Sequence, residues 1–363
     1  MGERVDADAP ASGHGRGRLH VPHTLHATRR GLLKSALKLA GYAACVYVVL
    51  RLIPSLRQAL DNLERVHWQW VVAALALETL SETGFVASWR AIVDPDNLLC
   101  REGRRTGTRA AWAQLGGGTL VPAGSLAGVG VGAWIMHRFG MPPKLIAERQ
   151  FNLSFLNTAV DAIALVVFGL GLATGILAGK HDLSLTLLPA ALAAMAVAAA
   201  LLIAGRVAPH AQRLAPRHPR IAGSLTTLAD AVDDTGRLLY HGGRCKAVLG
   251  AQVYLWFDVL VLFIALAAVH AHPVPTFAVV VMAYIIGALG GSLPLPAGLG
   301  TIGGMVGMLI VFGVAHTPAI AAVLVYQAVG LLVPLVGGTI AYLLLRRHLA
   351  PIAADEASTS PGK

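Results

Sequence analysis

The feature that most constrains the fold is a run of 87 residues (346 − 258 − 1) without Asp, Glu, Lys or Arg, between Asp258 and Arg346. A helix that crosses a bilayer needs about 20 predominantly apolar residues, so this run alone could cross about three to four times. The whole chain is 55% hydrophobic and 13% charged, against roughly 25% charged residues in an average soluble domain. These values predict an all-α polytopic membrane protein.

Continuous apolar segments predict six full transmembrane helices. They lie near Ala36–Ile53, Trp70–Val93, Phe151–Leu177, Leu185–Ala204, Val248–Val269 and Ile320–Leu345. Two further apolar segments, Ala110–Phe139 and Phe277–Phe312, are interrupted by Gly and Pro and predict re-entrant hairpins.

Polar tails flank the predicted membrane domain. Residues 1–34 are basic and His-rich, residues 349–363 are polar, and both are expected to be disordered. The transmembrane domain between them is expected at residues 35–348. Its two halves are expected at about 35–180 and about 185–348, and the second half contains a cytoplasmic basic loop at 206–246.

The net charge of +10 would suggest nucleic acid as a partner of a soluble protein, but here it indicates orientation. Cytoplasmic loops of membrane proteins collect Lys and Arg, and the basic clusters place both termini in the cytoplasm of a multi-pass protein of the cell membrane. Cys45, Cys100 and Cys245 are isolated and have no metal-ligand spacing. We therefore expect no metal, no cofactor and no nucleic acid.

The two interrupted segments carry a repeated motif. Residues 116–124 read GGGTLVPAG and residues 290–298 read GGSLPLPAG, 174 positions later (290 − 116), with five of the nine positions identical. Each half would contain helix, helix, hairpin and helix, and three crossings per half would invert the second copy relative to the first. Inverted repeats with broken segments at matching positions are typical of secondary transporters.

The breaks are candidate sites for a headgroup. Unpaired backbone groups in hydrocarbon cost several kcal/mol unless they face protein or water, and the N-terminus of a half-helix favours an anion such as phosphate. The alternative is that these glycines serve only close helix packing. The candidate pathway residues are Pro122, Gly124, Ser125, Pro296, Gly298, Gly300 and Thr301.

Ionisable residues within predicted spans are functional candidates, because charge is costly in a bilayer. Glu78 and Glu82 lie four residues apart on one helix face, and Asp161 and Asp258 lie in later helices. They could carry protons or contact substrate, or they could form buried structural hydrogen bonds. Arg138 and Arg149 lie near membrane boundaries and are candidate polar partners of carboxylates or of lipid phosphates, and Tyr326 and Gln327 are further candidate polar partners.

Motifs of nucleotide-dependent or hydrolytic enzymes are missing from the sequence. Residues 298–303 match GxGxxG, but no strand precedes them and no acidic residue follows about 20 positions on. There is no GxxxxGK[ST], GxSxG or HExxH motif. We expect neither an enzyme nor an ATP-driven pump.

The second half resembles the lysylphosphatidylglycerol synthetase transmembrane-region family, also called flippase-like integral membrane proteins. The resembling positions are Val253–Asp258, Pro296–Gly300, Phe312–Val314, Ala322–Tyr326, Pro334 and Tyr342. The resemblance extends over about 35–348, with Leu120–Gly124, Trp134–Gly140 and Ala147 onward as first-half counterparts. It implies translocation of lipids or lipid-linked headgroups.

Two positions depart from the family pattern. Gly303 stands where the family usually has Glu, and Gln327 follows Tyr326 where it usually has Arg. Loss of both members of a buried pair would avoid leaving one charge without a partner. The full synthetases add a large soluble transferase domain and this sequence ends at Lys363, so we expect no lysyl transfer.

The expected function is a path across the cell membrane for an anionic phospholipid or a polyprenyl-linked lipid. Two alternatives stay open at this point. One is a secondary transporter of a small anion or amphiphile, with Glu78, Glu82 or Asp258 carrying protons. The other is a scaffold that does not transport and that docks envelope-synthesis proteins through the basic loop.

Overall fold

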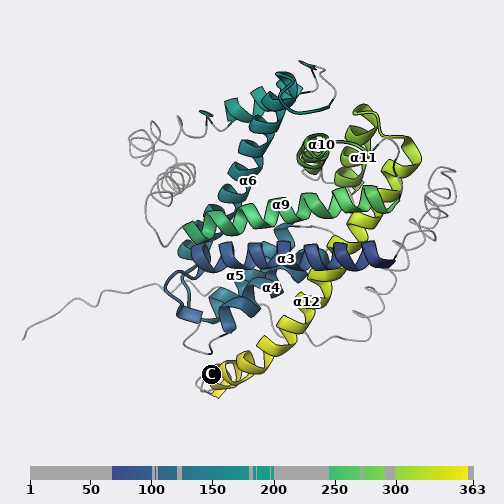
Figure 1. Cartoon of the computed structure of the whole chain (residues 1–363). Helices are drawn as coiled ribbons and strands as arrows, with labels where there is room; N and C mark the ends of the chain where they lie inside the picture. The colour runs from purple at the N-terminus through teal and green to yellow at the C-terminus, as the bar shows by residue number, and fades with distance from the viewer. Residues whose placement is uncertain are drawn as a thin grey trace, which may run out of the picture. The chain divides into compact units, whose positions relative to one another are not determined.

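The computed structural model describes the parts of the chain that carry most of the predicted helices (Figure 1). These residues are 68–99, 103, 105–120, 125–179, 183–184, 186–196, 198–199, 245–269, 271, 274–290 and 299–358. Within them the regular structure is helical and contains no strand. The predicted all-α class is confirmed for this part of the chain.

Four of the described helices are long and apolar enough to cross a membrane. They are α3 (Trp68–Val93), α6 (Pro143–Ala173), α9 (Cys245–Ala268) and α12 (His316–Ser358). Each overlaps a predicted span. α6 begins at Pro143, earlier than expected. A proline suits the first position of a helix, because the N–H group that it lacks would have no acceptor within the helix. α12 continues as a helix past position 348.

The other two predicted spans are described in part or not at all. Residues 186–196 form a shorter apolar helix within the segment predicted at Leu185–Ala204. The segment Ala36–Ile53, the tail at 1–34 and nearly all of the basic loop at 206–246 lie outside the described residues. The span count and the domain limits stay predictions.

Both interrupted segments consist of two short helices. The first contains α4 (Thr106–Leu120) and α5 (Ser125–Arg138), and the second contains α10 (Phe277–Leu289) and α11 (Leu299–Val311). The members of each pair pack against each other. α4 and α5 are separate helices, as are α10 and α11, and the Pro-Ala-Gly positions between them lie outside the described residues, so the cause predicted for each interruption stays a prediction.

The order of long and short helices is the same in both halves. A long helix, two short helices and a second long helix form α3 to α6, and the same order recurs in α9 to α12. The contacts also correspond: α4 packs on α12 as α10 packs on α6, and α3 contacts α6 as α9 contacts α12.

The most extensive contact between helices joins α3 and α9, which lie side by side in Figure 1. The Ser81 hydroxyl donates to the Tyr254 carbonyl at 2.8 Å, and the Ser88 hydroxyl donates to the Ala247 carbonyl at 2.8 Å. The first pair lies later in α9 and earlier in α3, so the helices run antiparallel. At Gly250 a Cβ atom would lie 2.6 Å from the Gly84 carbonyl oxygen, so the backbones touch.

α12 packs against α4 through a second pair of glycines. A Cβ atom at Gly116 would lie 2.8 Å from the Gly338 Cα, and one at Gly337 would lie 2.7 Å from the Trp112 ring. Pro334 lies inside α12 and supplies no N–H to the carbonyl of Gly330, four residues earlier. This carbonyl therefore has no helical donor.

We expect Gly250→Ala to destabilise the protein by about 1–3 kcal/mol, because the added methyl group would push apart the backbones of α3 and α9. Gly130→Ala is the matched control, since no atom lies within 4 Å of its Cβ position. The control should be neutral or more stable by about 0.5–1 kcal/mol, since alanine favours a helix. Unfolding by SDS titration in detergent micelles measures both. Equal stability of the two variants would contradict the close contact.

Candidate functional site

Three carboxyl groups are buried where α3 and α9 meet. Glu78 and Glu82 are one turn apart on α3, so both lie on the same face of the helix. Their exposed fractions are 4% and 3%, and that of Asp258 on α9 is 6%. Carboxyl groups are rarely buried to this extent without partners, so the site is unusual for the interior of an apolar bundle.

Asp258 is held by tyrosines from two other helices. The Tyr284 hydroxyl of α10 donates to Oδ2 of Asp258 at 2.5 Å, and Tyr326 of α12 lies close enough to Asp258 to interact with it electrostatically. The Tyr284 and Tyr326 rings meet edge to face, with centroids 6.0 Å apart. Tyr326, predicted as a polar partner, therefore belongs to this site.

The electrostatic interactions within the site are mainly between like charges. Asp258 and Glu82 both act on Glu78, and Asp258 acts on Asp161 of α6. The sequence places no Lys, Arg or His in α6 after Arg149, in α9 after Lys246, or in α10. The structure thus brings the four predicted ionisable residues into one region, which we call the carboxyl cluster: Glu78, Glu82, Asp161 and Asp258.

Several oxygen atoms of the carboxyl cluster are buried and accept no hydrogen bond from the described residues. They are Oε2 of Glu78, Oε2 of Glu82 and Oδ1 of Asp258. The other oxygen of Glu78, Oε1, lies 3.6 Å from the position of a Cβ at Gly330. The carboxyl group of Glu78 therefore lies against the α12 backbone near the carbonyl that Pro334 leaves without a helical donor.

Three of the predicted pathway residues lie at the N-termini of short helices. Ser125 begins α5, and Gly300 and Thr301 lie in the first turn of α11. Gly290, at the end of α10, faces the carbonyl oxygen of Gly300 so closely that no side chain would fit. Pro122, Gly124, Pro296 and Gly298 lie outside the described residues. Whether a headgroup passes these positions stays a prediction.

The two positions that depart from the family pattern lie on α11 and α12. Nothing lies within 4 Å of a Cβ at Gly303, so the space for a side chain exists there. Gln327 is half-buried and follows Tyr326 on α12.

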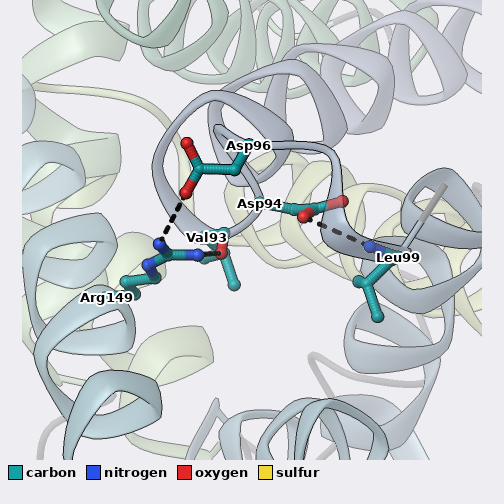
Figure 2. Close-up of polar contacts among 5 residues, drawn as sticks. All are labelled: Val93, Asp94, Asp96, Leu99 and Arg149. Carbon is teal, nitrogen blue, oxygen red and sulfur yellow. Dashed lines mark hydrogen bonds and ion pairs between the residues drawn. The ribbon is translucent and has the colours of Figure 1, made fainter. Parts of the chain in front are cut away.

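Figure 2 shows a second polar group at the C-terminal end of α3. Arg149 of α6 donates to the Val93 carbonyl at 2.7 Å and forms an ion pair with Asp96 at 3.2 Å. A cation at a helix C-terminus stabilises the exposed carbonyl groups. Arg138 lies over the Trp134 ring at 5.8 Å. These contacts of the two predicted partners lie at the ends of helices.

Asp94 belongs to this second group and was not predicted from the sequence. Its Oδ1 atom accepts a hydrogen bond from the Leu99 N–H at 3.4 Å, and its side chain is 1% exposed. Burial raises the pKa of the Asp94 carboxyl above its usual range, while backbone hydrogen bonds and the nearby Arg149 lower it by less.

A buried amide network was also missed from the sequence. Trp89 Nε1 donates to Oε1 of Gln114 at 2.7 Å, and the Gln114 and Gln150 amides bond each other at 3.0 and 2.8 Å. A Cβ at Gly132 would overlap the Gln114 amide. The network joins α3, α4 and α6, with α5 packed closely against it at Gly132, and no pattern in the sequence relates residues on these separate helices.

No group of three or more His, Cys, Asp or Glu in the described part of the chain could hold a metal ion.

The sequence model of a protein family, the lysylphosphatidylglycerol synthase TM region, matches residues 35–338 of the chain. The chain belongs to this family. The predicted resemblance is thereby confirmed over most of its expected range, and together with the long apolar helices it makes the protein a multi-pass integral membrane protein with a lipid-related function. No curated protein matches the chain.

We expect Asp94→Asn to raise the melting temperature at pH 8. An aspartate with a raised pKa is destabilised in its ionised form, so its contribution to stability is present at low pH and is lost as the pH rises through the folded-state pKa. The advantage of the variant should therefore vanish below about pH 4, where the unfolded aspartate is also protonated. Thermal unfolding in detergent at several pH values measures this, and an advantage independent of pH would contradict it.

We expect Tyr284→Phe to cost about 1–3 kcal/mol of stability, because Oδ2 of Asp258 would stay buried without its hydroxyl donor. Tyr342→Phe is the matched control, since Tyr342 is 38% exposed on α12. SDS titration in micelles measures both variants. The assigned bond is wrong if the two variants unfold at the same SDS concentration.

Proposed function

We propose that the protein opens a path across the cell membrane for the headgroup of an anionic phospholipid or a polyprenyl-linked lipid. The observation that carries this proposal is the carboxyl cluster, together with Tyr284 and Tyr326, in the interior of apolar helices of a family member. An isolated charge in hydrocarbon costs tens of kcal/mol by Born estimates. A polar interior lowers this barrier for a headgroup while the acyl tails stay in lipid.

The repeated helix order supports an inverted repeat. We infer that α3 to α6 and α9 to α12 are two copies related by a two-fold axis in the membrane plane, with both termini in the cytoplasm. The matching contacts of α4 with α12 and of α10 with α6 agree with this relation. In such transporters, the site lies near the midplane, where the copies meet, and the carboxyl cluster lies beside the contact of α3 with α9.

Phosphate would be recognised by donors. The N-termini of α5 and α11, which begin at Ser125 and Leu299, offer free N–H groups and partial positive charge. A protonated carboxyl group and a tyrosine hydroxyl also donate to phosphate oxygen, whereas an ionised carboxylate repels it. A phosphate-bearing headgroup would therefore pass the carboxyl cluster while the carboxyl groups are protonated. This account needs no covalent chemistry, and we propose no enzymatic activity.

A secondary transporter of a small anion or amphiphile is the second candidate. The same buried carboxyl groups favour it, since proton relays of transporters consist of intramembrane Asp and Glu. It differs from the first candidate in its cargo, so labelled lipid and labelled solute distinguish the two. A scaffold for envelope-synthesis proteins would move neither.

We expect purified protein in vesicles of phosphatidylcholine and phosphatidylglycerol to expose fluorescent phosphatidylglycerol of the inner leaflet to external dithionite. Gly300→Leu should slow this movement at least about tenfold, because Gly300 is buried against Gly290 at the second break. Gly307→Leu on the same helix is the control and should retain the rate, since its Cβ position is free of atoms within 4 Å.

Three results would count against lipid movement along this path. Wild-type vesicles that behave like protein-free vesicles would favour a scaffold. Uptake of a small labelled anion without lipid movement would favour the second candidate. Equal slowing of lipid movement by both leucine variants would contradict a specific role for the segment between α10 and α11.

A further inference from the structure

α6 carries a row of hydrogen-bonding side chains that leads to the carboxyl cluster. Gln150, Ser154, Asn157 and Asp161 are spaced four, three and four residues apart, so they lie on one face of the helix. Successive members are about 4.5–6 Å apart along the axis. The row begins directly after Arg149, whose guanidinium is bonded at the end of α3.

Asp161, the last member of the row, faces ionisable groups from the neighbouring helices. α9 contributes Asp258 and Tyr254, and α10 contributes Tyr284. α3 contributes Glu78 and Glu82, which interact with Asp258. Among the described residues, the ionisable groups of α5 are His137 and Arg138 in its last turn. The groups that surround Asp161 are thus acids and phenols.

Helix packing alone does not explain the row. Gln150 is satisfied by Gln114, but Oδ1 of Asn157 is buried and accepts no hydrogen bond from the described residues. Ser154 is exposed, although it lies between two buried or half-buried polar neighbours. A polar site with acceptors that lack donors is suited to water, and water between these side chains would connect the row.

The carboxyl cluster also lacks donors. Glu78, Glu82 and Asp258 are each more than nine-tenths buried, and each has one oxygen without a partner in the described part of the chain. Glu78 lies against the backbone at Gly330, whose carbonyl lacks its helical donor because of Pro334. A proton on a carboxyl group turns an acceptor into a donor. The ligand that satisfies this arrangement is therefore a proton.

We propose that protons enter from the Arg149 end of α6, pass through water molecules held along the row and load the carboxyl cluster, and that their movement drives headgroup movement. The coupling rests on the proposed function, whereas proton uptake does not. In each transfer one O–H bond breaks and another forms. Water at one membrane face supplies the proton, water at the other face accepts it, and no redox step is needed.

The test uses the full chain in phosphatidylcholine and phosphatidylglycerol vesicles that contain the pH dye pyranine. A potassium gradient with valinomycin makes the interior negative, and the wild type should acidify it faster than protein-free vesicles. Asp161→Asn should lower proton uptake at least about tenfold, and Asp161→Glu should restore much of it, since Glu keeps the titratable group. Thr174→Val should leave uptake unchanged, because Thr174 is exposed and bonds its own helix at Leu170.

The same vesicles also report fluorescent phosphatidylglycerol movement, so the two ideas fail separately. Wild-type proton uptake equal to that of protein-free vesicles overturns the inference, whether or not lipid moves. Uptake by Asp161→Asn at the wild-type rate overturns the route along α6. Lipid movement that is unaffected by the proton gradient overturns the coupling, while absent lipid movement with intact proton uptake overturns only the proposed function. Size-exclusion chromatography confirms that each variant is folded.

Discussion

Burial of carboxyl groups among apolar helices is the constraint on which the rest of the structure depends. Glu78, Glu82 and Asp258 would be unstable in lipid, so the surrounding helices must enclose them. The contact of Gly84 with Gly250 brings α3 and α9 together at backbone distance, and tyrosines from α10 and α12 complete the enclosure. The close helix packing and the polar interior are therefore parts of one arrangement.

The two ends of this interior differ. On one side, the polar row of α6 connects the carboxyl cluster to the Arg149 end of the helix. On the other side, four aromatic rings pack together, with centroid distances of 5.5 to 6.3 Å: Phe168, Trp256, Phe263 and Phe277. Large apolar rings exclude water, whereas amides and carboxyl groups hold it. The two ends of the interior therefore differ in polarity, although the helix order repeats.

The sequence predicted the elements whose causes are local. Uninterrupted apolar segments predicted the four long helices, and the Pro-Ala-Gly motifs lie in the sequence between the two short helices of each pair, where proline and glycine disfavour a continuous helix. The carboxylates of the site were also identifiable, since charge within a span is rare. Their tyrosine partners, the Gln114–Gln150 pair and Asp94 depend on contacts between distant helices, and one sequence contains no such information. Arg149 pairs with the carboxylate of Asp96, and the sequence could not name this partner for the same reason: proximity to a membrane boundary does not specify a contact.

The central claim is that water reaches a polar interior along α6, and thiol labelling tests it most directly. With the three native cysteines replaced by serine, Asn157→Cys and Leu170→Cys are compared in vesicles with a water-soluble, membrane-impermeant reagent. Leu170 is 46% exposed on the apolar half of α6, so lipid should protect it. The account predicts that position 157 reacts and position 170 does not. Reaction at position 170 alone, or at neither position, would contradict it.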